Sequence, residues 1–353
     1  MKCQYYADNV NFNPNTYFKF MKSGGQFVIS LDFELFWGVR DKRRIEDYAS
    51  ALEKVHALVP EMLAMFREYE VKTTFATVGL LFAQDKKELI KYSPALKPNY
   101  KDANLSPYTD GFGIVKDNAV DDPYHFALPL IEMIKDKYPE HEIGTHTFSH
   151  YYCQEEGQTL ETFKADLGSA VDIARAKGIE LYSLVFPRNQ YNPEYLQVCK
   201  EMGILTYRGN EEAWYFAPDS KEGTTLKKKI YRTLDCYINI SGHNTYKLLD
   251  LISEKPYNIP SSRFFRPYMA KGGMPLEELK LRRIKNSMNY AAKNNLLYHL
   301  WWHPHNFGQN TNRNMDTLKR VLEHYKKLKL QYGFESFTMK DCALALSLME
   351  AKI

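Results

Sequence analysis

The chain has 353 residues, of which 44% are hydrophobic and 25% are charged, a composition typical of a soluble globular protein with a substantial core. The 47 Lys and Arg residues nearly balance the 43 Asp and Glu residues. The resulting net charge of +4 is too small to indicate a nucleic-acid partner.

Short apolar segments that end in polar residues predict strands along the chain. The first, residues 26–33, is rich in β-branched and aromatic residues and follows a Gly-Gly turn signal. Further strands are predicted at residues 72–78, 141–145, 181–186, 204–207, 295–302 and 334–339. Apolar residues at helical spacing predict helices at residues 46–69, 162–177, 193–202, 276–294 and 316–332. This alternation indicates a parallel sheet or barrel.

Two long segments, residues 84–140 and 210–270, carry Pro, Asn, Asp, Tyr and Gly without clear periodicity. Loops of that length are usually functional, so we expect insertions that shape a substrate site. The length of the chain would allow two domains, but α/β barrels run past 200 residues as one unit. We therefore expect residues 1–353 to form a single catalytic domain.

Cysteine usage and the first residues bear on the compartment. The five cysteines are scattered and form no Cys-x-x-Cys motif, so we expect no disulfide framework and a reducing compartment. Residues 1–20 contain no apolar run that could serve a signal peptide. No stretch reaches the ~20 apolar residues needed to span a bilayer. We expect a cytoplasmic protein without a transmembrane segment.

Ionisable residues follow several of the predicted strands, at the ends where parallel α/β folds form active sites. Asp32 and Glu34 end the first strand, and alternation along an extended chain places both carboxylates on one side. Such a pair suits a base beside a metal ligand, although two solvated acids would give the same pattern. His146 and His150 follow the third strand, and on a helical turn this spacing directs both imidazoles toward one metal ion.

Two later strand ends add an arginine and further histidines. Arg188 follows the fourth strand and could orient a carboxylate by a bidentate contact, although a surface arginine is the ordinary alternative. His299 and His303 repeat the spacing of the first histidine pair, so spacing alone does not identify metal ligands. His303, beside Trp residues at a strand end, is a candidate general acid, and we interpret His299 as a hydrogen-bonded core residue.

In this order, the segments resemble the polysaccharide deacetylase (NodB-homology) superfamily, also called carbohydrate esterase family four, over about residues 26–340. The most specific part is Glu-Ile-Gly-Thr-His-Thr-Phe-Ser-His at residues 142–150, which is similar to the second motif of the family. Residues 72–79 resemble its second strand. The resemblance implies a distorted (β/α)7-type barrel with long inserted loops. It also implies a metal, usually zinc, held by one carboxylate and two histidines.

The resemblance also implies roles for the residues at the strand ends. His146 and His150 match the two histidine ligands, Asp32 matches the catalytic base, and Glu34 matches the carboxylate ligand. The family usually has two adjacent acids at this point, whereas Phe33 separates them here, so the two acids could exchange roles.

The third and last motifs of the family supply the remaining catalytic residues. Arg188 matches the arginine that orients the base, although its Phe-Pro-Arg-Asn-Gln surroundings differ from the common form. His303 is the best match for the catalytic acid, and His305 is the second.

We therefore predict a metal-dependent hydrolase that removes an acetyl group from an N-acetylated sugar, such as a glycan precursor for surface polysaccharide. Zinc is the expected metal. We expect Trp37, Trp302, His305 and Asn189 to contact the substrate. Two alternatives are hydrolysis of a small cyclic amide or ureide, and a non-catalytic carbohydrate-binding protein on a degenerate deacetylase scaffold.

Overall fold

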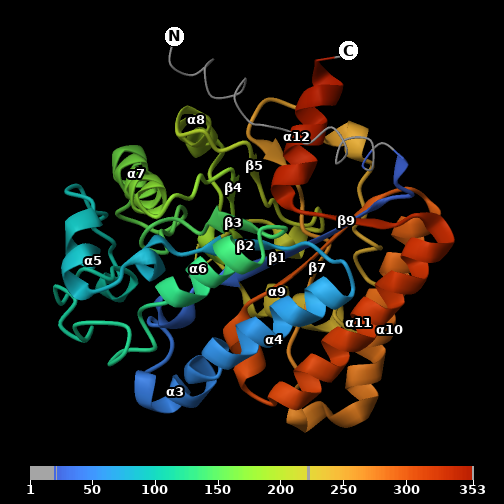
Figure 1. Cartoon of the computed structure of the whole chain (residues 1–353), viewed down its shortest axis with the longest axis horizontal. Helices are drawn as coiled ribbons and strands as arrows, with labels where there is room; N and C mark the ends of the chain where they lie inside the picture. The colour runs from blue at the N-terminus through green and yellow to red at the C-terminus, as the bar shows by residue number, and fades with distance from the viewer. Residues whose placement is uncertain (1–19, 21, 221–222, 352–353) are drawn as a thin grey trace.

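In a computed structural model of the chain, residues 20, 22–220 and 223–351 are described. This part contains a nine-stranded sheet in the order β6-β5-β4-β3-β2-β1-β8-β7, with β9 also paired to β1. Every strand pair is parallel. The sheet curls, and the helices lie around its outside (Figure 1). The predicted barrel-like α/β fold is confirmed.

Strand β1 has the predicted bounds, whereas the other predicted strands are in the expected place but shorter. The bounds are β1 Gln26–Phe33, β2 Thr74–Thr77, β3 Glu142–Thr145, β4 Ser183–Leu184, β5 Thr206–Tyr207, β6 Tyr257–Asn258, β7 Arg263–Phe264, β8 Leu297–Trp302 and β9 Glu335–Phe337. The strands β6 and β7 were not predicted, because two residues are too few to show a period-2 pattern.

Strand β1 lies at the centre of the sheet and has three neighbours. Residues 26–31 pair with β8 along one edge. On the other edge, residues 26–28 pair with β9 and residues 30–33 pair with β2. All eight residues of β1 are buried, as expected for a parallel strand that is covered on both faces.

The segment that contains β6 and β7 joins the two ends of this sheet. Ile259 and Ser261 donate backbone hydrogen bonds to residues 207 and 209 beside β5, whereas Ser262 and Phe265 donate to residues 299 and 301 of β8. The segment thereby holds opposite edges of the curled sheet together. The stretch 210–270, expected as an insertion, thus supplies two edge strands in addition to loops.

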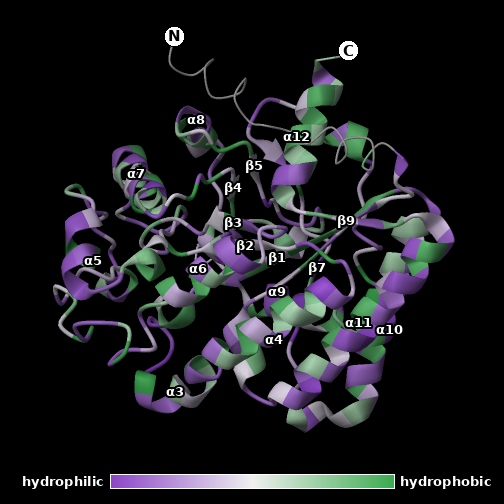
Figure 2. Ribbon diagram, in the orientation of Figure 1, coloured by the Kyte–Doolittle hydropathy of each residue, from purple (hydrophilic) through white to green (hydrophobic). Residues whose placement is uncertain are grey.

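Most helices cover the outer face of the sheet. The helices are α3 Ile45–Glu53, α4 Val55–Glu68, α5 Lys86–Tyr92, α6 Leu128–Lys137, α7 Leu160–Ala176, α8 Leu196–Glu201, α9 Leu226–Leu234, α10 Gly273–Lys293, α11 Thr311–Tyr332 and α12 Met339–Glu350. Unlike the others, α9 has no buried residue and contacts the turn Trp214–Phe216. The single helix predicted at residues 46–69 is two helices that meet at Lys54. The apolar spacing runs across this break, so the sequence pattern did not reveal it. Helices α10 and α11 lie side by side and alternate in hydropathy, as expected of helices with one buried face (Figure 2).

Alternate residues of β1 enter different environments. Phe27, Ile29, Leu31 and Phe33 belong to the large hydrophobic core that also contains residues of α4, α7 and α11. On the opposite face, Val28 packs in a second cluster with residues of α12. The next residues on that face are Ser30 and Asp32, which are polar and buried. Buried polar groups need hydrogen-bond partners, so the inside of the curled sheet must supply them.

The expectations of free cysteines and of no signal peptide concern some residues that lie outside the described part. Cys153, Cys199, Cys236 and Cys342 are free and buried, whereas Cys3 lies outside the described residues. The absence of a signal peptide concerns residues 1–20, of which only Phe20 is described. Within the described part of the chain, none of the helices combines the length and the apolar character that crossing a membrane requires.

Candidate active site

The ends of four strands bring the candidate residues together at one edge of the sheet, where parallel α/β folds place their active sites. Strand β1 ends at Phe33 and β3 at Thr145, while β5 ends at Tyr207 and β8 at Trp302. The side chains contributed there are Asp32, Glu34, His146, His150, Arg208 and His303.

A carboxylate and two imidazoles form a compact buried cluster. The Nε2 atoms of His146 and His150 lie 3.3 Å and 3.0 Å from Oε2 of Glu34. One ligand atom from each residue lies within 4.8 Å of the others. All three residues are at most 3% exposed. Two imidazoles and a carboxylate are a typical three-residue ligand set for zinc.

The hydrogen bonds of His146 show that this cluster suits a cation. Its Nδ1 lies 2.7 Å from the carbonyl oxygen of Val185, and a carbonyl can only accept, so Nδ1 carries the proton. In the neutral ring the lone pair of Nε2 then faces the carboxylate of Glu34, and this buried nitrogen has no hydrogen-bond partner. A lone pair opposite a carboxylate is repulsive unless a cation lies between them.

His150 is held in a similar way. Its Nδ1 lies 3.0 Å from the hydroxyl oxygen of Tyr152. Burial lowers the pKa of His150 to about 4, although Glu34 opposes this shift. The ring is therefore neutral near pH 7, as a metal ligand must be.

Gly38 leaves the space that the Glu34 carboxylate occupies. The turn Leu35–Gly38 follows β1 directly, and a Cβ atom at Gly38 would lie 1.9 Å from Cδ of Glu34. A side chain at this position would therefore displace the carboxylate from the two histidines.

The histidine pair lies on a loop after β3 and not on the helical turn that its spacing indicated. Thr147 and His150 have φ angles of 63° and 59°, in the left-handed region that non-glycine residues rarely adopt. Local hydrogen bonds hold this loop: the backbone N–H of Tyr151 donates to Oγ1 of Thr147, and that of Phe148 donates to the buried carboxylate of Asp166. The prediction that the imidazoles of His146 and His150 converge on one point is consistent with this geometry. The prediction that they lie on a helical turn was wrong.

Asp32 is held by an arginine that the sequence analysis did not single out. The guanidinium of Arg208 donates to both carboxylate oxygens of Asp32, at 2.7 Å and 2.9 Å. It also donates to Ser30 Oγ and to Asn189 Oδ1, at 2.9 Å and 2.8 Å. Its carbon Cζ lies 4.1 Å from the ring centroid of Trp301. Such a bidentate pair fixes the orientation of the carboxylate.

The pKa of Asp32 reflects these opposing influences. Burial raises the pKa, but the charges of Arg208, His146 and His303 and the Arg208 hydrogen bonds lower it by more, so that it lies below its usual range. The carboxylate is therefore ionised near neutral pH.

Arg188, which we expected to orient the base, contacts other acids. It forms ion pairs with Asp41 and with Glu155 and lies over the ring of Tyr152. Its φ of 56° turns the chain after Pro187, and the guanidinium that reaches Asp32 comes instead from the next strand of the sheet. Arg208 directly follows the predicted fifth strand, so the rule of polar residues at strand ends could have found it.

His303 faces both acids. Its Nε2 lies 3.6 Å from Oδ2 of Asp32 and 3.6 Å from Oε1 of Glu34. The Nδ2 amide of Asn306 lies 3.2 Å from Nδ1 of His303. An amide NH2 can only donate, so the ring proton of neutral His303 is on Nε2, facing the acids. His305 lies behind it, 3% exposed, with Nε2 3.8 Å from Glu34.

His299 is a buried core residue, as interpreted from the sequence. It is 0% exposed, and its Nε2 lies 2.8 Å from Ser30 Oγ while its Nδ1 lies 3.1 Å from the carbonyl oxygen of Ile259. It therefore has no part in the histidine pair that faces Glu34.

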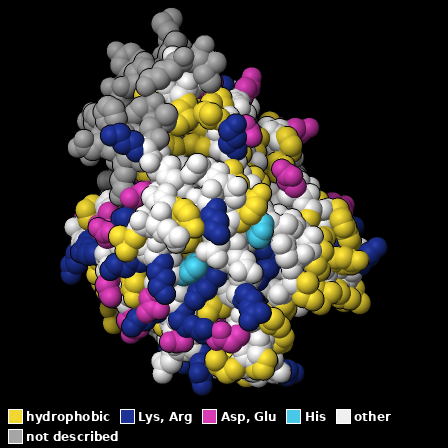
Figure 3. All heavy atoms as spheres, turned by 90° about the vertical axis from the view of Figure 1, so that its right-hand side faces the viewer, with side chains coloured by type: hydrophobic (Ala, Val, Ile, Leu, Met, Phe, Trp, Pro, Cys, Tyr) yellow, Lys and Arg dark blue, Asp and Glu magenta, His cyan; other side chains and the backbone are white. Residues whose placement is uncertain are grey.

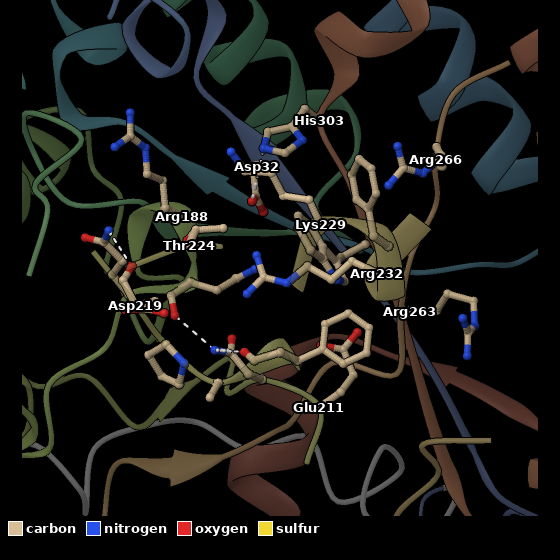
Figure 4. A pocket seen from close by; sticks show the side chains of 18 of the residues that line it. Asp32, Arg188, Glu211, Asp219, Thr224, Lys229, Arg232, Arg263, Arg266 and His303 are labelled. Carbon is tan, nitrogen blue, oxygen red and sulfur yellow. Dashed lines mark hydrogen bonds and ion pairs between the residues drawn. The ribbon is translucent and has the colours of Figure 1, made fainter. Parts of the chain in front are cut away.

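A cavity of about 400 Å3 opens beside Asp32, Glu34, His150 and His303 (Figure 4). Asn189 lines it, as does Trp301. The other residues expected to contact a substrate are placed differently. Trp37 donates to the backbone of His125 within the core, and Trp302 is fully buried. Because side chains alternate along β8, the cavity receives Trp301 and the core receives its neighbour.

Comparisons with known proteins concern the family and the fold. The polysaccharide deacetylase family matches residues 47–207, a range that contains both histidines of the cluster. No curated protein matches the chain. The fold resembles that of a candidate polysaccharide deacetylase from Mycobacterium smegmatis, with a TM-score of 0.58, 13% identity and coverage of 93% of this chain and 92% of the other.

Two further solved structures share this fold. One is a candidate polysaccharide deacetylase from Pseudomonas aeruginosa PAO1, with a TM-score of 0.54, 13% identity and coverage of 94% and 92%. The other is Puue allantoinase, with a TM-score of 0.52, 13% identity and coverage of 93% and 91%. The match to the polysaccharide deacetylase family covers less than half of the chain, whereas the likeness of fold to these solved structures covers more than nine tenths of it.

Proposed function

We propose that the protein is a metal-dependent deacetylase that hydrolyses the acetamide of an N-acetylated sugar. The observation that supports this most directly is the convergence of two imidazole Nε2 atoms on one oxygen of Glu34. A second carboxylate and a third histidine face the same cavity. These are the groups that a hydrolytic site needs: cation ligands, a base and an acid.

Glu34, His146 and His150 would hold the metal, for which we propose zinc on the basis of the ligand types. Such an ion lowers the pKa of water and polarises a carbonyl oxygen. The fit rests on the buried, unpartnered Nε2 of His146 that faces the Glu34 carboxylate.

The remaining residues handle protons. Asp32, ionised and oriented by Arg208, accepts a proton from the attacking water. His303 in its protonated form donates a proton to the leaving amine nitrogen, since its Nε2 faces the cavity on the side of both acids. In that form Nδ1 of His303 also carries a proton, which the side-chain oxygen of Asn306 accepts once its amide is flipped. Asp32 and His303 thus divide the base and acid roles between two sides of one substrate.

The experiment combines metal analysis with acetate release. We expect Asp32→Asn to abolish acetate release from N-acetylated sugars while the protein keeps its metal, because this residue is not in the ligand cluster. We expect His146→Ala to lose both. The matched control is His324→Ala, a half-buried histidine whose partner is Asn289 on the neighbouring helix. Full activity in both site variants would refute the assignment.

Two other functions remain testable in the same assay. The fold shared with Puue allantoinase makes a small ureide a useful member of the substrate panel. Hydrolysis of the ureide without acetate release from any sugar would favour that function. A purified protein without metal, and without activation by added zinc, would favour a carbohydrate-binding protein.

A further inference from the structure

Three cations that line the cavity have no ion-pair partner. Lys229, Arg232 and Arg266 are among the lining residues, and none of them pairs with a carboxylate in the described part of the chain. The other two arginines of the lining are neutralised. Arg188 pairs with two acids, as described above, and Arg263 forms an ion pair with Asp235 at 2.9 Å.

The acids of the same region are also accounted for. Asp219 is paired with Lys228 at 2.6 Å, and Asp235 is paired with Arg263. Burial raises the pKa of Glu211, and Glu211 acts on the pKa of Arg232. Even with Glu211 ionised, the three cations without ion-pair partners outnumber it, so the uncompensated charge is positive.

The two unpaired arginines are fixed by their Nε atoms and keep their terminal nitrogens available. Nε of Arg232 donates to the carbonyl oxygen of Tyr215 at 2.5 Å. Nε of Arg266 lies 3.4 Å from Sγ of Cys236. Within the described residues, the terminal nitrogens of both side chains have no hydrogen-bond partner. Figure 4 shows the side chain of Arg232 lying across the middle of the cavity, whereas Arg263 points away from it.

Helix α9 supplies two of these cations and is oriented unusually. Lys229 and Arg232 are three residues apart and line the cavity. The apolar residues Leu226, Ile230 and Leu234 lie on another face and are 72%, 48% and 43% exposed. Surface helices normally bury such an apolar face. Figure 3 shows one face of the molecule, on which exposed hydrophobic side chains lie between Lys and Arg side chains. The helix therefore directs its cationic face to the cavity at the expense of apolar burial.

We propose that Lys229, Arg232 and Arg266 bind a phosphate group carried by the acetylated sugar, so that the substrate is a glycosyl phosphate or its ester. This inference rests on the proposed deacetylase function. Terminal guanidinium nitrogens match phosphate oxygens bidentately, and three cations suit a phosphate better than a single carboxylate. The same cavity reaches Asp32 and His303, so one ligand can place its acetamide at the acids and its phosphate at the cations.

The first arm of the experiment measures binding without catalysis. Inorganic phosphate is titrated into the wild-type protein, Arg232→Gln and Arg266→Gln by calorimetry. Each substitution removes a charge-assisted contact, and we expect the affinity to fall about tenfold. The control is Lys227→Gln on the same helix, since this lysine lies over the ring of Trp214 and does not line the cavity. It should bind phosphate like the wild type.

The second arm measures acetate release from four substrates: a neutral N-acetylhexosamine, its 1-phosphate, its nucleoside-diphosphate ester and its polyprenyl-phosphate ester. We expect KM for the phosphorylated forms to be at least tenfold lower than for the neutral sugar. Arg232→Gln and Arg266→Gln should reduce this preference about tenfold. The ester with the highest kcat/KM identifies whether the phosphate comes from a nucleotide or a lipid carrier.

The two arms separate this inference from the proposed function. Phosphate binding that depends on the two arginines, without acetate release from any substrate, would support the phosphate subsite and refute the deacetylase. Acetate release at equal kcat/KM from neutral and phosphorylated sugars would refute the subsite and support the deacetylase. Unchanged phosphate affinity in both arginine variants would also refute the subsite, provided that circular dichroism shows folded proteins.

Discussion

Substitution of Arg208 gives the sharpest test of how the site holds its base. In the wild type, the Arg208 guanidinium is 1% exposed and makes two hydrogen bonds to Asp32, with one more each to Ser30 and Asn189. Arg208→Met retains an apolar stem over Trp301 but leaves the buried Asp32 carboxylate without its cation. Arg208→Lys retains the charge but cannot reproduce the bidentate geometry.

The structure sets the size of the expected effects. Breaking a buried ion pair by removing one partner costs about 3–5 kcal/mol, so Arg208→Met should lower the free energy of unfolding by about 4 kcal/mol. Arg208→Lys should cost about 2 kcal/mol, the contribution of one hydrogen bond to a charged group. The double variant Asp32→Asn/Arg208→Met should be less destabilised than the sum of the single variants by about 2 kcal/mol.

The assays are chemical denaturation of the wild type, the three single variants (Asp32→Asn, Arg208→Met and Arg208→Lys) and the double variant, and the pH profile of kcat/KM for Arg208→Lys. Arg208 lowers the pKa of Asp32 against the opposing effect of burial. Weakening their contact should therefore raise this pKa and move the acid limb of the profile to higher pH. Additive effects in the double variant, together with an unmoved acid limb, would refute the role of Arg208 as a positioning residue for Asp32.

Three other predictions concern stability and the metal. Burial lowers the pKa of His141 from 6.5 to about 4, so between these pH values the unfolded chain binds one more proton. The free energy of unfolding should fall by about 3 kcal/mol from this group as the pH is lowered. His141→Asn, which keeps an acceptor for the N–H of Thr73, should flatten that slope, and an equally steep slope would contradict the reasoning. Trp302→Ala should lower the free energy of unfolding by about 3–5 kcal/mol, whereas Trp301→Ala should mainly raise KM. If Trp301→Ala instead lowers the stability and Trp302→Ala raises KM, Trp302 and not Trp301 contacts the substrate. A chelator should lower the Tm of the wild type, since loss of a ligand present at 1,000 times its Kd removes about 4 kcal/mol. His146→Ala should melt at the same temperature with and without chelator, and a chelator effect in that variant would argue against His146 as a ligand.

The sequence predicted the long central strands well because their patterns extend over many residues. Strand β1 and strand β8 have eight and six residues, and each reads as an apolar run that ends in ionisable side chains. Strands β6 and β7 have two residues each. Their place in the sheet depends on backbone hydrogen bonds to distant strands, and no local periodicity records such bonds.

The sequence predicted which strand ends carry the site residues. It did not predict which of these side chains contact one another. The convergence of His146 and His150 followed from spacing, yet the loop that achieves it depends on Asp166, a residue of α7. Arg188 and Arg208 both follow short strands. Arg208 contacts Asp32 whereas Arg188 contacts Asp41 and Glu155, and these long-range contacts leave no local pattern in the sequence.

The three neighbours of β1 have a consequence for how the chain folds. Residues 26–33 emerge first during synthesis, but their partners on β8 are residues 297–302 and those on β9 are residues 335–337. Strand β1 must therefore remain unpaired on one edge until residues 297–302 have been made. Non-local parallel pairing of this kind folds slowly and exposes strand edges to aggregation. Asp32 lies on β1 and His303 directly follows β8, so the proposed base and acid come together only after this late pairing.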